Sequence, residues 1–120
     1  MTRIKLALAA LAVAATAVVS AAQAAPKATI LVATDGPGFT ITLKSAGKIV
    51  KKLKAGTYVV RVSDKSAIHN FHLVGPGVAK TTGVAFTGTK TWTVKLKVGK
   101  YTYICDPHAA VMKGSFTVTA

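Results

Sequence analysis

Four side chains with donor atoms suited to a transition metal stand out in this chain. They are His69, Cys105, His108 and Met112. Thiolate and thioether sulfur are soft donors that suit Cu(I), whereas imidazole nitrogen also suits Cu(II). A site with both kinds of donor can hold copper in two oxidation states with little rearrangement. The sequence therefore predicts one copper ion with the ligand set of a type 1, or blue-copper, electron-transfer site.

Zinc is the main alternative metal, because cysteine and histidine also bind it well. The methionine argues for copper, since thioether is not among the usual zinc ligands. Asp106 could offer an oxygen, but it directly follows Cys105 at the end of an expected strand. Neighbouring side chains of a strand point to opposite faces, so we expect Asp106 to be a charge at the rim of the site.

The first 24 residues have the pattern of a cleavable secretion signal. Arg3 and Lys5 form a positive start, residues 6–19 are almost entirely Ala, Leu and Val, and Ala22-Gln23-Ala24 is a small-x-small cleavage pattern. The alternative is an uncleaved membrane anchor, although the apolar run is shorter than the roughly 20 residues that a span needs. We expect cleavage after Ala24, no stable membrane span afterwards, and a periplasmic, extracellular or cell-surface location.

Export makes the only cysteine of the chain informative. Outside the cytoplasm thiols usually pair as disulfides, and a single cysteine cannot pair within one chain. A lone buried cysteine can simply act as a small apolar side chain. The nearby histidine and methionine favour a ligand role for Cys105 instead.

Residues 25–120 are enough for one domain with one modest core. Short runs rich in Thr, Val and Ile alternate with Gly, Pro and Asp, which is typical of an all-β fold. The expected strands are 28–34, 39–45, 49–53, 57–63, 68–74, a weak one at 84–87, 90–97, 101–105 and 115–119. Alternation places Trp92, Val94, Leu96 and Val98 on one face, and Tyr101, Tyr103 and Cys105 on another. Seven to nine strands of this length predict a Greek-key β-sandwich.

The chain is strongly basic, with 16 Lys and Arg against three Asp and no Glu, so its formal net charge is +13. Without Arg3 and Lys5 the charge of the mature chain is 14 − 3 = +11. No nucleic-acid-binding motif is present, and we expect no nucleic-acid partner. The lysines either form a solvated face or attract acidic redox proteins and anionic cell-surface polymers.

Together, Tyr101-Thr102-Tyr103-Ile104-Cys105-Asp106-Pro107-His108, Met112 and the upstream His69-Asn70 pair resemble the plastocyanin, pseudoazurin and amicyanin branch of the cupredoxins. The resemblance covers essentially the whole mature domain and implies an eight-stranded Greek-key sandwich with one copper. It implies that His69, Cys105, His108 and Met112 are the ligands. It also implies that Asn70 ties the strand of the first ligand to the cysteine loop by hydrogen bonding, which orients that ligand.

Two features qualify the match. Three residues separate His108 from Met112, whereas plastocyanins and pseudoazurins usually have four and amicyanins two, so Met112 is either an axial ligand of unusual bond length or a core-filling methionine. His72 competes with His69, but residues three apart on a strand face opposite ways. The resemblance favours His69, because Asn70 then takes the family position.

We expect an exported, monomeric one-electron carrier that is not an enzyme. A copper-trafficking protein and a metal-free cationic sandwich are the alternatives. Around His108 we expect an uncharged rim of Pro107, Ala109, Ala110 and Val111, completed by the turn at residues 75–77.

Overall fold

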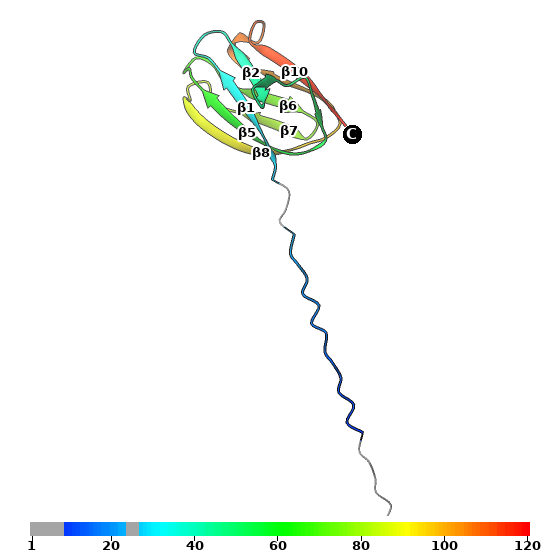
Figure 1. Cartoon of the computed structure of the whole chain (residues 1–120). Coiled ribbons are helices and arrows are strands. Elements are labelled where there is room, and N and C mark those ends of the chain that lie inside the picture. The colour runs from blue at the N-terminus through cyan, green and yellow to red at the C-terminus, as the bar shows by residue number, and fades with distance from the viewer. Residues whose placement is uncertain (1–8, 24–26) are drawn as a thin grey trace, which may run out of the picture.

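The protein is a β-sandwich of two five-stranded sheets in a computed structural model that describes residues 9–23 and 27–120 (Figure 1). Within these residues there are ten strands, one short 3-10 helix and no α-helix. The prediction of an all-β sandwich is confirmed, although the strands outnumber the seven to nine expected.

The first sheet has the strand order β3-β2-β1-β5-β8. Its strands are β1 (Thr29–Asp35), β2 (Ile41–Ser45), β3 (Lys48–Ile49), β5 (Gly56–Asp64) and β8 (Gly88–Leu96). The second sheet has the order β4-β10-β9-β6-β7. Its strands are β4 (Lys52–Lys54), β6 (His72–Gly75), β7 (Val78–Thr81), β9 (Gly99–Ile104) and β10 (Lys113–Thr119). Both sheets are mixed, because β1 runs parallel to β5 and β4 runs parallel to β10.

The core lies between the sheets and follows the two-residue period of the strands. Val94 and Leu96 on β8 are buried and Trp92 is partly buried, as alternation predicted. The prediction for Val98 is wrong: this side chain is 60% exposed, because β8 ends at Leu96 and Val98 lies in the following turn.

Three strand predictions need correction. The run 49–53 is divided between β3 and β4, which belong to different sheets and are separated by the buried Val50. The weak strand expected at 84–87 does not form. A strand that was not predicted, β7, lies shortly before it in the chain. The strand expected at 68–74 begins only at His72, so His69 lies in a loop.

The predicted secretion signal falls mostly in an extended segment. Residues 9–23 have no regular secondary structure, are exposed, and lead away from the sandwich (Figure 1). Arg3, Lys5 and the expected cleavage site after Ala24 lie outside the described residues, so cleavage remains a prediction. No helix in the described part of the chain has the length and apolarity to cross a bilayer.

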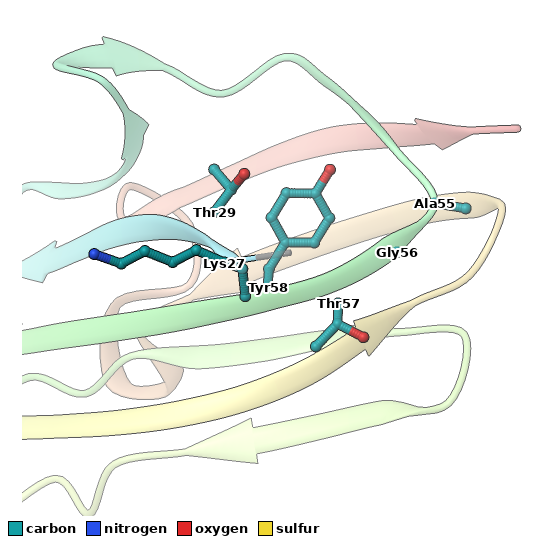
Figure 2. A pocket seen from close by; sticks show the side chains of 7 residues that line it. Lys27, Thr29, Ala55, Gly56, Thr57 and Tyr58 are labelled. Carbon is teal, nitrogen blue, oxygen red and sulfur yellow. The ribbon is translucent and has the colours of Figure 1, made fainter. Parts of the chain in front are cut away.

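A cavity of about 450 Å³ lies where β1 and β5 begin, lined by residues that include Lys27, Thr29, Thr57 and Tyr58 (Figure 2). It contains none of the predicted metal donors. Those donors lie at the other end of the sandwich, where β1, β5 and β9 finish.

Candidate metal centre

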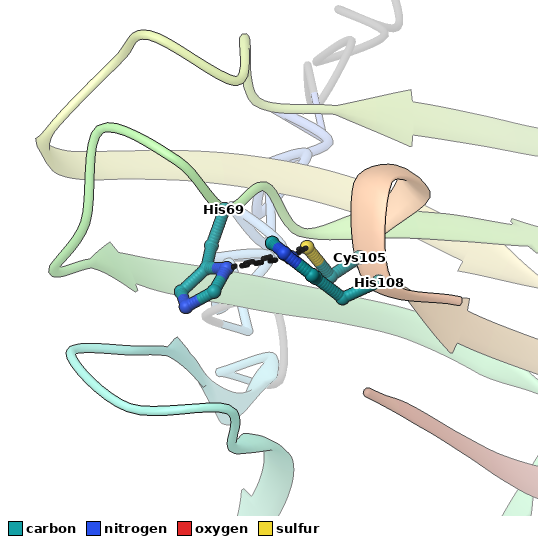
Figure 3. Close-up of side chains that lie close together, drawn as sticks. All are labelled: His69, Cys105 and His108. Atoms are coloured by element: carbon teal, nitrogen blue, oxygen red, sulfur yellow. Dashed lines mark hydrogen bonds between the residues drawn. The ribbon is translucent and has the colours of Figure 1, made fainter. Parts of the chain in front are cut away.

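Three of the four predicted donors converge at one end of the sandwich. His69 comes from the loop between β5 and β6, Cys105 directly follows β9, and His108 ends the 3-10 helix η1 (Asp106–His108). Figure 3 shows both imidazole rings turned toward the cysteine sulfur. His69 and Cys105 are buried and His108 is partly exposed. The site is thus closed toward the core and accessible on the His108 side.

The Cys105 side chain points inward because it continues the alternation of β9, in which Tyr101 and Tyr103 are also buried. The residues after it form a tight loop closed by backbone hydrogen bonds. The N–H of His108 donates to the Cys105 carbonyl (3.0 Å), and the N–H of Met112 donates to the His108 carbonyl (2.8 Å). The N–H of Cys105 in turn donates to the Met112 carbonyl (3.0 Å). The three-residue spacing therefore returns Met112 beside Cys105, with its side chain completely buried.

The donor atoms fit a single metal ion. The Nδ1 atoms of His69 and His108 are 3.0 Å apart, and the Cys105 Sγ lies 3.7 Å from the first and 3.6 Å from the second. A point equidistant from the corners of a triangle with these sides is about 2.0 Å from each atom, close to the usual lengths of metal–nitrogen and metal–sulfur bonds. Two nitrogens and one sulfur in a trigonal arrangement are typical of blue-copper sites.

Asn70 connects the His69 loop to the cysteine loop. The backbone N–H of Asp106 donates to Asn70 Oδ1 (2.7 Å), and Asn70 Nδ2 donates to Asp106 Oδ2 (2.7 Å) and to Thr81 Oγ1 (3.0 Å). Asn70 is only 2% exposed, so water cannot replace these bonds. The role that the family resemblance implied for Asn70 is present, and it extends to β7 through Thr81.

Asp106 is a rim residue, as expected, but it is not an isolated charge. Its carboxylate also lies 3.0 Å from Nδ1 of His72, with the side chains 46% and 29% exposed respectively. Hydrogen bonding with His72, and then with Asn70, lowers the pKa of Asp106. His72 is not a member of the donor cluster and supports the loop through Asp106. The strand-parity argument for this outcome does not apply, because His69 lies in a loop and not on β6.

Phe39 is a residue of the site that the sequence did not reveal. Its ring packs edge-on against both imidazoles, with ring centres 5.4 Å from His69 and 4.9 Å from His108. The side chain is nevertheless 61% exposed. A phenyl ring has no donor atom, and the sequence predicted Phe39 only as the first residue of a strand.

The expected rim is partly wrong. Pro107, Ala109, Ala110 and Val111 are exposed next to His108, as predicted. The turn at 75–77 lies at the other end of β9: the Tyr101 hydroxyl donates to the Pro76 carbonyl (2.7 Å), and β6 runs away from Cys105 toward that turn. Phe39 and the 58% exposed Ile68, which precedes His69, take its place. We call Phe39, Ile68, Pro107 and Ala109–Val111 the apolar rim.

The fold and the donor cluster together define the cupredoxin class. A family profile described as copper-binding proteins of the plastocyanin/azurin family matches residues 48–119, and the chain belongs to this family. Its cofactor is copper, and the cluster of His69, Cys105 and His108 agrees with a type 1 site.

Similar solved structures show the same fold. A mutant of rusticyanin is 23% identical, with 79% of this chain and 80% of that chain covered and a TM-score of 0.59. Reduced rusticyanin is 24% identical, with coverage of 80% and 82% and a TM-score of 0.56. Rusticyanin from Thiobacillus ferrooxidans is also 24% identical, with 79% of each chain covered and a TM-score of 0.54. A search of curated proteins found no match.

Proposed function

We propose that this protein is an exported blue-copper carrier that passes single electrons between larger redox proteins. The observation that carries the proposal is the compact triangle of His69 Nδ1, Cys105 Sγ and His108 Nδ1 on a cupredoxin scaffold. Copper bound there supplies a Cu(II)/Cu(I) couple. The proposal includes no bond-making chemistry and therefore no enzymatic activity.

The protein contributes a rigid, largely dry set of ligands. Cys105 is fixed by its strand, His69 by the Asn70 network, and His108 by the closed loop. Because these connections hold the donors close together, the two oxidation states require little rearrangement of the protein. Met112, buried beside Cys105, is proposed as the weak axial ligand.

His108 is proposed as the point where electrons enter and leave. It is the only partly exposed member of the three-residue cluster, and its Nδ1 faces the other donors, which leaves Nε2 on the far side of the ring. The six residues of the apolar rim are uncharged, and the neighbouring Asp106 is paired with His72, so a partner could approach His108 closely. This geometry gives a short electron path from the surface to the metal.

The proposed partners are acidic redox proteins, with anionic cell-surface polymers as a second class. A hollow of about 430 Å³ on the outer face of β9 and β10 is lined by Lys51, Lys100 and Lys113. In the described part of the chain these lysines form no salt bridge. Unpaired lysines around a hollow attract carboxylates over long range and can orient a partner before contact.

The assignment of the ligands is tested by two single substitutions. Cys105→Ala should abolish the intense visible absorption of the copper-loaded protein, because that band requires the cysteine–copper bond. His72→Ala is the matched control: it removes an imidazole three residues from His69 and should leave the band intact. Loss of the band in the His72 variant, or its survival without Cys105, would overturn the assignment.

A further inference from the structure

Asp35 and Asp64 are two buried acids that the proposed electron carrier does not use. They end the neighbouring parallel strands β1 and β5 and are direct register partners. Both occupy inward-facing positions in the alternation of their strands. The exposed fraction of Asp35 is 0% and that of Asp64 is 3%. The fold therefore holds two carboxyl groups side by side in the interior.

These carboxyl groups have very few hydrogen-bond partners. The Ser66 backbone N–H donates to Asp64 Oδ1 (3.2 Å), while both oxygens of Asp35 and Oδ2 of Asp64 have no partner. Buried carboxylates are normally paired or well hydrogen-bonded, since burying an isolated charge is costly. Two ionised carboxylates in this position would be strongly destabilising.

No neighbouring cation compensates for the pair in the described residues. Lys65 is exposed and forms no salt bridge with Asp35, although its backbone N–H donates to the Asp35 carbonyl (2.9 Å). Lys90, two residues from the register partner of Asp64, places its ammonium over the Phe86 ring. The residue paired with Asp35 on β2 is the apolar Ile41.

The other titratable groups to consider in the interior are Tyr103 and the metal donors. Tyr103 points into the core from the opposite sheet, and burial raises its pKa, so it stays neutral. The donor cluster of His69, Cys105 and His108 includes neither aspartate. Burial, and then the charge of Asp64, raises the pKa of Asp35 to about 7. A proton on one carboxyl would let it donate to the other and would remove the repulsion between them.

Both acids are connected to the loop that carries His69. Gly36 follows Asp35, and a Cβ atom built on it would lie 3.3 Å from His69 Cδ2 and 2.9 Å from Ser66 Cβ. On the other strand, Ser66 donates to Asp64 through its N–H and accepts from the His69 N–H through its carbonyl (3.3 Å). The chain next to each acid therefore lies against the loop that carries the buried histidine, through Gly36 after Asp35 and through Ser66 after Asp64.

We propose that Asp35 and Asp64 share one proton and that this proton is bound more tightly when the copper is reduced. Oxidised copper carries one more positive charge, which repels a proton inside the low-dielectric core. Reduction removes that charge, and the pair takes up a proton from water as the donor protein supplies the electron. Oxidation returns both, so the protein would couple proton uptake to electron transfer. This inference rests on the proposed function.

The coupling is tested by the reduction potential of the copper-loaded protein between about pH 5 and pH 9. The potential should fall as the pH rises through neutrality, by about 59 mV for each tenfold difference in proton affinity between the two copper states. Asp35→Asn should remove this dependence. His72→Gln tests the competing histidine that is paired with Asp106 beside the cysteine loop: the slope should survive in this variant, and its loss would overturn the coupling. A flat wild-type profile, or an equal slope in Asp35→Asn, would overturn the coupling.

A second measurement keeps the pair testable if Asp35→Asn does not fold. In the wild-type protein without metal, carbon NMR of the side-chain carboxyls should show one aspartate that remains protonated up to near-neutral pH. If every aspartate carboxyl titrates near its ordinary range, the shared proton is disproved. If the copper protein has no reversible couple, the proposed carrier function fails, and this titration still decides whether the pair exists.

Discussion

Phe39 is an exposed side chain that contacts both imidazoles of the metal centre. Its ring lies against His69 and His108 while more than half of it remains exposed. Apolar groups around a metal control solvent access and therefore the reduction potential. At the scale of single residues, Phe39 and Met112 are the positions where the properties of this site can be adjusted.

We expect Phe39→Ala to lower the reduction potential and to preserve the visible band. Greater contact with water stabilises the more highly charged Cu(II) state, whereas the Cys105 bond is untouched. If the lost contact changes the free-energy difference between Cu(II) and Cu(I) by about 1 kcal/mol, the size of an aromatic contact, the potential changes by roughly 40 mV for one electron. Voltammetry with Phe39→Leu as the control distinguishes lost shielding from lost aromaticity. An unchanged potential in the alanine variant would show that Phe39 does not shield the site.

We expect Met112→Leu to raise the reduction potential while the protein remains folded. The leucine side chain is similar in volume, so the core should lose less than about 1.5 kcal/mol of stability. Although thioether is a soft donor, loss of an axial donor of any kind removes electron density from the metal, and this loss destabilises the more positive Cu(II) state more than Cu(I). Voltammetry and urea unfolding of the same variant measure both effects. A potential equal to that of the wild type would make Met112 a core-filling residue, the alternative that the sequence left open.

The donor residues could be predicted because their types are scarce: the chain has one cysteine and three histidines. The contact of Phe39 could not be predicted, since it depends on how the loop after β1 folds over the histidines. The pairing of Asp106 with His72 was missed for a similar reason. It joins residues 34 positions apart, and neither side chain alone indicates the other.

At the scale of elements, the site depends on connections between loops rather than on the strands alone. The loop between β5 and β6, strand β7 and the cysteine loop meet at Asn70. Three separate segments are thereby held by one buried amide. This makes Asn70 the position where a small change should loosen the whole site.

We expect Asn70→Ala to destabilise the copper-free protein by about 1–3 kcal/mol, because it leaves buried polar groups without partners. The Asp106 N–H and Thr81 hydroxyl would lose their contacts with Asn70. Chemical denaturation measures the loss, and Thr81→Val is a control that keeps the Asp106 contacts of Asn70 and removes the Thr81 hydroxyl with its bonds to Asn70 and to the Thr82 carbonyl. A stability equal to the wild type would mean that the amide does not fasten the loops.

The buried acids Asp35 and Asp64 at the ends of β1 and β5 make the stability of the fold depend on pH. The sign of this dependence follows from the raised pKa of Asp35. The folded protein keeps a proton on Asp35 up to about pH 7, whereas the unfolded chain loses it near its ordinary pKa of 3.8. Stability from this group is therefore complete below about pH 4, falls as the pH rises toward 7, and is constant above. The total loss is at most about 4 kcal/mol.

This prediction is measured by denaturing the copper-free protein at several pH values. Asp35→Asn should be more stable than the wild type above pH 7 and should show a flatter profile between about pH 4 and pH 7. If the stability of the wild type and that of Asp35→Asn changed with pH in the same way over this range, the buried acid pair would be contradicted.

The elements themselves were only partly predictable. Alternation identified β1, β2, β5, β8, β9 and β10 closely, because each has a clear apolar face toward the core. The strand expected through His69 was wrong, since Asp64 and Ser66 offer local side-chain and backbone hydrogen bonds that form a turn there instead. The separate strands β3 and β4 were missed, because strands of two and three residues are too short for their sequence pattern to show that the chain passes from one sheet to the other.

The whole molecule is a basic particle with very few acids. Of its three aspartates, two are buried together and the third is paired with His72. The described surface therefore offers little negative charge to offset the lysines around Lys51, Lys100 and Lys113. This distribution supports the proposed attraction of acidic partners.

We expect electron transfer with an acidic redox protein to slow as salt rises from about 0.01 M to 1 M, because screening shortens the electrostatic range from about 30 Å to about 3 Å. Lys100→Glu should reduce the rate at low salt more than Lys95→Glu, which makes the same charge change on an exposed position of β8. Stopped-flow kinetics measures both variants. Equal effects would indicate that only the total charge matters and not the lysine-lined hollow.

The central claim concerns the metal centre and is tested most directly by the optical and electron-spin spectra of the copper-loaded domain through one cycle of reduction and oxidation. The proposed carrier should bind one copper, show an intense visible band and a Cu(II) spin signal, lose both on reduction, and recover both on oxidation. Colourless protein that binds only Cu(I) would favour copper trafficking, and protein that binds no copper would favour a metal-free sandwich. Either result would contradict the electron-carrier function.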